Sequence, residues 1–135
     1  MINIKYLKSN FTDKRGNIID LFVNQPKEHC SLVSFIDGAV RGNHYHKKST
    51  QFTFVLNGNF NLFYAKVDTR GEIIGKVNKI EVKPNAFITH EPFEAHSFQL
   101  LDQFGLVIAF ACGIRGGSSY EKDTFRLKQP MCNIK

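Results

Sequence analysis

Two histidines separated by a single residue, His44 and His46, are the first candidates for chemistry in this sequence. On a β-strand, residues two apart point to the same side, so both imidazoles would face one cavity. Imidazole titrates near neutral pH, which suits a general base, and its neutral form is a common metal ligand. A His-x-His pair can equally face solvent at the end of a strand. The surrounding residues therefore decide what the pair does.

Several further polar residues could meet this pair. Gln51 opens the next apolar segment, and His96 begins another one later in the chain. If both segments are strands that line one barrel, three imidazoles and one amide converge on a small cavity. Arg41 could stabilise a developing negative charge or clamp a diphosphate, or it could be a plain surface residue. Tyr64 alternates with apolar residues, which predicts a barrel-wall aromatic, with contact to a base or sugar as the alternative.

The same residues support two kinds of site. In an isomerase, His44 and His46 would be the base that removes a proton next to a carbonyl and its partner. Arg41 and Gln51 would then lie near the enolate oxygen. In a metal site, the two histidines and His96 would supply three nitrogens to Zn, Fe or Ni, with Gln51 as a weak neutral fourth ligand. Both possibilities remain open at this stage.

The elements that would position these residues are predicted to be strands, because apolar residues alternate at a period of two almost throughout. Asn57-Gly58, between two β-rich segments, is a strong hairpin signal. We expect an all-β fold, an antiparallel sandwich or barrel, in a single domain over residues 1–135. The expected strands are residues 2–6, 18–23, 30–36, 51–56, 59–67, 77–82, 86–89, 95–101, 104–112 and 124–127.

Composition and charge narrow the function class. Hydrophobic residues make up 42% of the chain and charged residues 22%, as in ordinary globular proteins. No apolar run is long enough for a membrane span and no signal peptide pattern is present, so we expect a cytoplasmic protein without a membrane partner. The net charge is +6, but the 18 basic residues are scattered and no nucleic-acid motif occurs. Such a surface equally suits an anionic small molecule, such as a nucleotide sugar, and we expect no nucleic-acid partner.

The cysteines and the remaining histidines are predicted to be bystanders. Cys30, Cys112 and Cys132 have no CxxC spacing, which argues against both a disulfide framework and a zinc finger. Cys112 lies in an apolar segment and is predicted to be a buried thiol. His29 and His90 lie near expected turns and are predicted to be solvated.

The spacing around the histidine pair resembles the first motif of the cupins, G-x5-H-x-H-x3,4-E-x6-G. The residues in register are Gly38, His44, His46 and Gly58, with Gln51 where the family usually has Glu. The second cupin motif is represented by His96, preceded by Glu91-Pro92-Phe93. The resemblance covers roughly residues 30–110, and it implies a cupin-type antiparallel β-barrel, or jelly-roll.

Within the cupins, the segment from Arg41 to Gln51 is similar to the motif of dTDP-4-oxo-6-deoxyglucose 3,4-ketoisomerases, in which the Gln is native. This likeness implies an isomerase for surface-polysaccharide sugars, with His44 and His46 as catalytic groups, no metal or other cofactor, and a homodimer. Residues 42–46 are also similar to cupin domains of capsular-polysaccharide epimerases and reductases, some of which hold zinc. A metal-binding epimerase is therefore the alternative, and a non-catalytic sugar-binding cupin is the third possibility.

The ends of the chain carry two further expectations. The apolar segment Ile2–Tyr6 could pair across a two-fold axis and cover an open strand edge, which supports the expected homodimer. Arg115-Gly116-Gly117 could wrap a phosphate with backbone N–H groups, although a plain loop is the simpler prediction.

Overall fold

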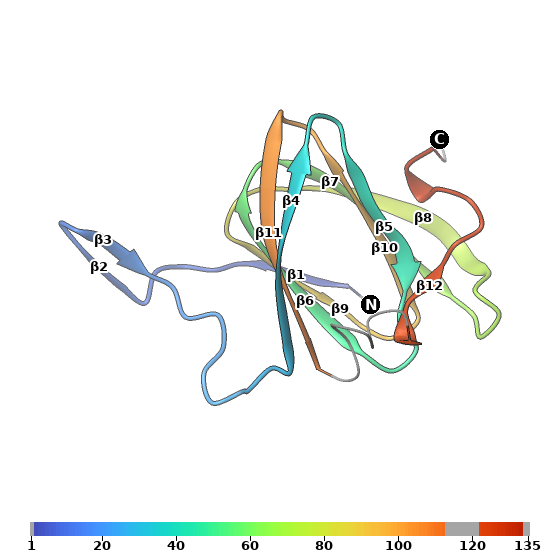
Figure 1. Ribbon diagram of the computed structural model, residues 1–135, viewed down its shortest axis with the longest axis horizontal. Helices are drawn as coiled ribbons and strands as arrows, with labels where there is room; N and C mark the ends of the chain where they lie inside the picture. Colours follow the sequence, from blue (N-terminus) through green and yellow to red (C-terminus); the bar gives the residue numbers. More distant parts are fainter. Residues whose placement is uncertain (1, 113–121, 134–135) are drawn as a thin grey trace.

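The period-two pattern produces strands almost throughout, and they form two five-stranded antiparallel sheets that enclose a common interior (Figure 1). This computed structural model describes residues 2–112 and 122–133. The first sheet has the order β1 (Asn3–Tyr6), β9 (Ala86–His90), β6 (Thr50–Asn57), β11 (Phe104–Cys112) and β4 (His29–Ile36). The second has the order β12 (Phe125–Arg126), β5 (Val40–Tyr45), β10 (Glu94–Leu100), β7 (Phe60–Val67) and β8 (Ile73–Val82). The expected all-β architecture is confirmed.

The interior between the sheets is apolar at one end, where Phe35 and Phe60 meet edge to face with ring centroids 4.9 Å apart. Alternation along the strands divides the two faces of the second sheet. Tyr45 and Ala95 belong to a separate apolar cluster, which is closed by Met131 from a short 3-10 helix (Met131–Asn133). Their sequence neighbours His44 and His96 point to the opposite face, into the interior. Within residues 2–112 and 122–133, no helix is long and apolar enough to cross a membrane.

The segment 18–23 is not a strand, contrary to the prediction. A separate hairpin, β2 (Phe11–Asp13) and β3 (Gly16–Ile18), precedes it and ends at its first residue. The rest of the segment crosses the outside of the first sheet, where Phe22 packs edge-on against Phe52, Phe87 and Phe110. Phe22 therefore serves packing against a sheet rather than pairing within one, whereas Ile18 and Val23 at the two ends of the segment are exposed.

The N-terminal strand also differs from the prediction. Segment 3–6 pairs with β9 of its own chain, with Ile4 opposite Ile88, so it already occupies the edge that it was expected to cover in a partner. The β2–β3 hairpin instead projects away from the two sheets (blue in Figure 1).

Cys112, at the end of β11, was predicted to be a buried thiol, but it is half-buried.

Candidate active site

A close approach of two strands brings the histidines together. Gly42 and Asn43 have positive φ angles of 99° and 62°, just before His44. A Cβ atom at Gly42 would lie only 2.7 Å from the backbone oxygen of His96, so this position requires glycine. Next to it, the pairing of β10 with β5 shifts register between His96 and Ser97. The bulge places His44 directly opposite His96.

The structure gathers three of the predicted imidazoles into one cluster. The ring centroid of His44 lies 5.1 Å from that of His46 and 4.9 Å from that of His96, and the latter two are 5.5 Å apart. One nitrogen from each ring lies within 4.8 Å of the others. His46 and His96 are each 1% exposed, whereas His44 is half-buried.

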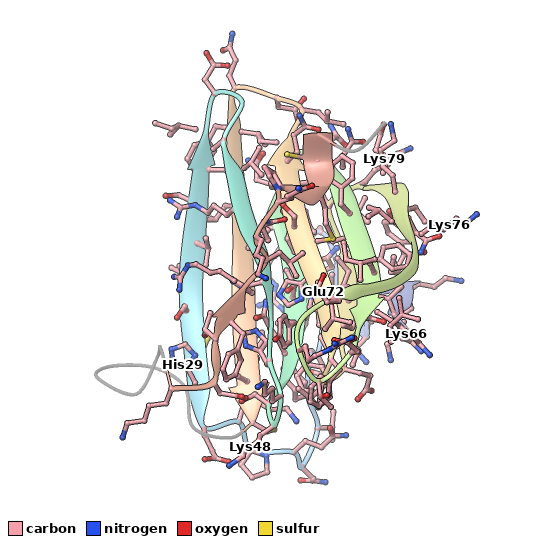
Figure 2. All side chains as sticks on the ribbon, turned by 90° about the vertical axis from the view of Figure 1, so that its right-hand side faces the viewer. His29, Lys48, Lys66, Glu72, Lys76 and Lys79 are labelled. Carbon is pink, nitrogen blue, oxygen red and sulfur yellow. The ribbon has the colours of Figure 1, made fainter. Side chains whose placement is uncertain are left out.

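A cavity of about 610 Å³ lies beside this cluster. Its wall includes four polar side chains from the interior, those of His44, Gln51, Thr53 and His96. Much of β4 completes the wall, including its first residue, His29, which is labelled in Figure 2. His29 is half-buried, with Nε2 3.1 Å from Ser31 Oγ, rather than solvated as predicted. The predicted site residues Gln51 and His96 therefore share the cavity wall with His44, and His46 adjoins them.

Two arginines line the same cavity and remain exposed, which places them at its mouth. Arg41 was predicted, and its Nε donates to the backbone oxygen of Ser34 over 3.0 Å. Arg126 was missed by the sequence reasoning. It lies on β12, where it pairs with His44 on β5. A strand was expected at residues 124–127, but the sequence does not show that this strand pairs with β5.

His46 is held by the C-terminal segment. Its Nδ1 donates to the backbone oxygen of Asp123 over 2.7 Å. The carboxylate of Asp123 in turn accepts hydrogen bonds from the backbone N–H groups of Lys47, Lys48 and Ser49 and from the Ser49 hydroxyl, over 2.7–3.3 Å. Burial favours the neutral acid, but these hydrogen bonds, led by that of Ser49, outweigh it and hold the pKa of Asp123 below its ordinary value. Asp123 was not among the predicted site residues.

His96 offers a lone pair to the cluster. Its Nδ1 lies 3.2 Å from the backbone oxygen of Glu94, which can only accept, so Nδ1 carries the proton. Burial, and then the charges of His90, His44 and His46, lower the pKa of His96 well below its ordinary value, so the ring is neutral at pH 7. Its buried Nε2 has no hydrogen-bond partner among the described residues. A ligand with a hydroxyl group would satisfy this atom.

Comparison with known proteins identifies the architecture. No protein-family model and no curated protein matches the sequence. Among solved structures, QdtA, a sugar 3,4-ketoisomerase from Thermoanaerobacterium thermosaccharolyticum in complex with TDP, superposes with a TM-score of 0.73 at 18% identity, covering 94% of this chain and 88% of that one. A 3,4-ketoisomerase from Helicobacter canadensis gives 0.75 at 14% identity, covering 93% and 90%. A dTDP-4-dehydrorhamnose 3,5-epimerase from Sulfolobus tokodaii gives 0.72 at 22% identity, covering 91% and 74%.

The chain has the cupin jelly-roll fold. At these identities the likeness establishes the architecture, and the chemistry must come from the residues of this chain. In it the cluster can serve two purposes. The rings can transfer protons within the cavity, or one nitrogen from each of His44, His46 and His96 can bind a divalent metal ion. The free Nε2 of His96 fits a metal, but both nitrogens of His46 already have partners, Asp123 O and Gln51 Oε1.

One predicted residue lies away from the cavity, and a further unpredicted residue joins the site. Tyr64 packs against the apolar core, and the structure does not bring it to the cavity wall. Arg115-Gly116-Gly117 falls outside the described residues. His90 was predicted to be solvated, but it is fully buried, with its ring centroid 4.1 Å from that of His96. Strand β9 continues one residue further than predicted, so that Ala86, Ile88 and His90 alternate on its inner face. Extending the period-two pattern by one residue would have found it.

Proposed function

We propose that this cupin is a cofactor-independent isomerase of a nucleotide-linked 4-keto-6-deoxyhexose. Its specific reaction would be the 3,4-ketoisomerisation of a dTDP-linked sugar, in cytoplasmic synthesis of surface-polysaccharide precursors. The observation that carries this proposal is the group of three imidazoles beside a cavity of about 610 Å³ with two arginines at its mouth. The motif from Arg41 to Gln51 and the similar structures named as 3,4-ketoisomerases support the same reaction.

The reaction needs only proton transfers. The proton on C3 is removed by His44, which lines the cavity, or by His46 after its Nε2 has given up the bond to Gln51 Oε1. The electron pair of the C3–H bond then forms a C3–C4 double bond, and the C4 oxygen receives a proton. The resulting enediol loses the proton of the C3 hydroxyl and gains one at C4, which leaves the carbonyl on C3. The Nε2 of His96 can accept a hydrogen bond from a sugar hydroxyl, and the amide of Gln51 lies in the same wall. Atoms and electrons balance without a further reactant.

Turnover of dTDP-4-keto-6-deoxyglucose, followed by NMR of the sugar carbonyl, tests this function directly. We expect the carbonyl to move from C4 to C3 and, in deuterated water, solvent deuterium to enter the ring at the carbons next to it. The exchange can be partial if one histidine passes the proton straight across. Binding without turnover or exchange, for this and other nucleotide-linked 4-keto-6-deoxyhexoses, would leave a sugar-binding cupin as the remaining interpretation.

Arg126 is expected to bind the diphosphate of the substrate, because its guanidinium is an exposed cation at the mouth of the cavity. Arg126→Ala should raise KM about tenfold with little change in kcat, since hydrogen bonds to charged groups are worth about 1.5–3 kcal/mol and solvent screens this one. The difference should shrink as salt is added. Arg70→Ala, at an exposed turn, is the control. An equal KM in the two variants would contradict this assignment.

A metal-dependent epimerase is the second candidate, because one nitrogen from each of three histidines lies within 4.8 Å of the others. In that case His44, His46 and His96 would hold the ion with Gln51 as a weak fourth ligand, and the ion would polarise the sugar carbonyl. His46 would have to give up one of its two hydrogen bonds to bind it. We therefore expect exhaustive treatment with a chelator to leave turnover unchanged. Loss of turnover that added zinc or iron restores would favour the metal-dependent enzyme.

We further propose that the protein is a homodimer in which the β2–β3 hairpin contacts a second copy. Phe11 and Ile18 lie opposite each other on this hairpin and are 53% and 57% exposed. The hairpin projects from the body (Figure 1), and a lone two-stranded hairpin is marginally stable in water. Phe11→Asp should convert a dimer into a monomer by light scattering at micromolar concentration, whereas Thr12→Asp on the same hairpin should not. A monomeric wild type would refute the dimer.

A further inference from the structure

A chain of three hydrogen bonds runs from the histidine cluster into the first sheet. The Nε2 atom of His46 lies 3.2 Å from Gln51 Oε1. The other end of that amide donates to Thr53 Oγ1 over 3.2 Å. The hydroxyl of Thr53 then lies 3.0 Å from Nε2 of His90. Only the first two members of this chain, His46 and Gln51, were expected at the site.

The three side chains beyond His46 share the inner face of the first sheet. Gln51 and Thr53 are two residues apart on β6, and Gln51 pairs with His90 on β9. Their exposed fractions are 7%, 1% and 0%. Polar groups in an apolar interior are costly unless they are hydrogen-bonded, and an apolar residue would fill the position of Thr53 at lower cost. The chain therefore indicates a role other than core packing.

Both ends of the chain contact the histidine cluster. At one end the Gln51 amide meets His46. At the other end the ring of His90 lies against that of His96, with an interplanar angle of 30°. His96 belongs to β10 of the second sheet and His46 directly follows β5 of that sheet, whereas Gln51, Thr53 and His90 belong to the first. The hydrogen-bonded series of the first sheet thus contacts two imidazoles of the second sheet, those of His46 and His96.

We propose that Thr53 and His90 are positioning residues that fix the Gln51 amide and the His96 ring, and with them the spacing of the histidines beside the cavity. What that spacing serves rests on the proposed function. The hydroxyl of Thr53 is the link that can be cut with the least change in shape, because valine replaces it by a methyl group. A displacement of about 1 Å among reacting groups can cost about 10²-fold in rate.

Kinetics of three variants of the full chain test this role. Thr53→Val should lower kcat about ten- to a hundredfold and leave KM within about twofold, because the cavity mouth is untouched. Thr53→Ser keeps the hydroxyl and should restore most of the wild-type kcat. Thr89→Val is the matched control, because Thr89 is adjacent to His90 on β9 and so points to the other face of the sheet, opposite Phe52. An equal loss in Thr53→Val and Thr53→Ser would overturn the role.

A spectroscopic measurement tests the series of hydrogen bonds from His46 to His90 without any substrate. In protein labelled with 15N-histidine at one fixed pH, Thr53→Val should move the ring nitrogen shifts of His90 and His46, and Thr89→Val should leave them in place. Unchanged shifts in Thr53→Val would overturn the proposed chain even if the enzyme is active. If no nucleotide-linked keto sugar is turned over, the proposed function fails, and the ring nitrogen shifts still decide whether Thr53 links these residues.

Discussion

Replacing His44 or His46 with asparagine is expected to lower kcat by about 10²–10⁴-fold, the usual contribution of general acid–base catalysis. Asparagine keeps a polar side chain of similar reach but has no group that titrates near neutral pH. His44 lines the cavity, so its loss removes a proton acceptor that the sugar can reach. His46 is 1% exposed and bonded to Asp123 and Gln51, so its loss also releases those partners.

Binding and isotope exchange separate this effect from a general disruption of the cavity. The affinity for the dTDP moiety, measured by calorimetry, should stay close to that of the wild type in both variants, because the arginines at the mouth are untouched. In deuterated water, the variant that lacks the base should also lose solvent deuterium incorporation at the sugar carbons. Wild-type turnover in both single variants would reject this site outright. Loss of bound metal together with activity in both would instead support the metal-dependent candidate.

The fold could be predicted because apolar and polar residues alternate along most of the segments that form strands. Side chains on a pleated strand alternate between faces, so each inward position needs an apolar residue or a polar one with a partner. The prediction failed where an apolar segment packs on a sheet instead of joining it. Phe22 rests against three phenylalanines on the outside of the first sheet. Local alternation around Phe22 does not distinguish these two uses of apolar residues.

The histidine cluster could be predicted only in part, because its members come from different parts of the chain. His44 and His46 share a face through their own spacing, and a motif pointed to His96. The partners of His46 and His44 depend instead on which strands become neighbours. Asp123 is 77 residues from His46, and Arg126 meets His44 only because β12 pairs with β5. No local pattern encodes such a pairing, so these contacts required the structure.

Asp123→Ala is expected to lower the free energy of unfolding by about 3 kcal/mol, because it leaves several buried or part-buried hydrogen-bond donors without their acceptor. The N–H groups of Lys47, Lys48 and Ser49 and the Ser49 hydroxyl all bond to this carboxylate. Hydrogen bonds to charged groups contribute about 1.5–3 kcal/mol each, but they are not additive, and the freed loop can recover part of the loss by binding water. Asp123→Asn keeps one acceptor oxygen and should lose less.

Urea denaturation at pH 7 measures this loss, with Asp102→Ala as the control. Asp102 also accepts from a backbone N–H, that of Asn59 at 2.6 Å, but it is exposed, so its removal should cost about 1 kcal/mol or less. Because the pKa of Asp123 is lowered, the stability that its charge contributes is present above the ordinary value of 3.8 and is lost as the pH falls through the lower folded value. The gap between wild type and Asp123→Ala should therefore narrow below that pH.

Turnover of Asp123→Ala tests whether the contact between Asp123 and His46 matters for catalysis. The backbone oxygen that accepts from His46 Nδ1 belongs to the same residue whose carboxylate holds the loop 47–49. Releasing the carboxylate frees that oxygen to move, so kcat should fall even at temperatures where the variant is fully folded. The fall should approach the tenfold range, because His46 loses its fixed orientation but keeps its imidazole. A folded Asp123→Ala protein with wild-type kcat would show that His46 needs no anchor from the C-terminal segment.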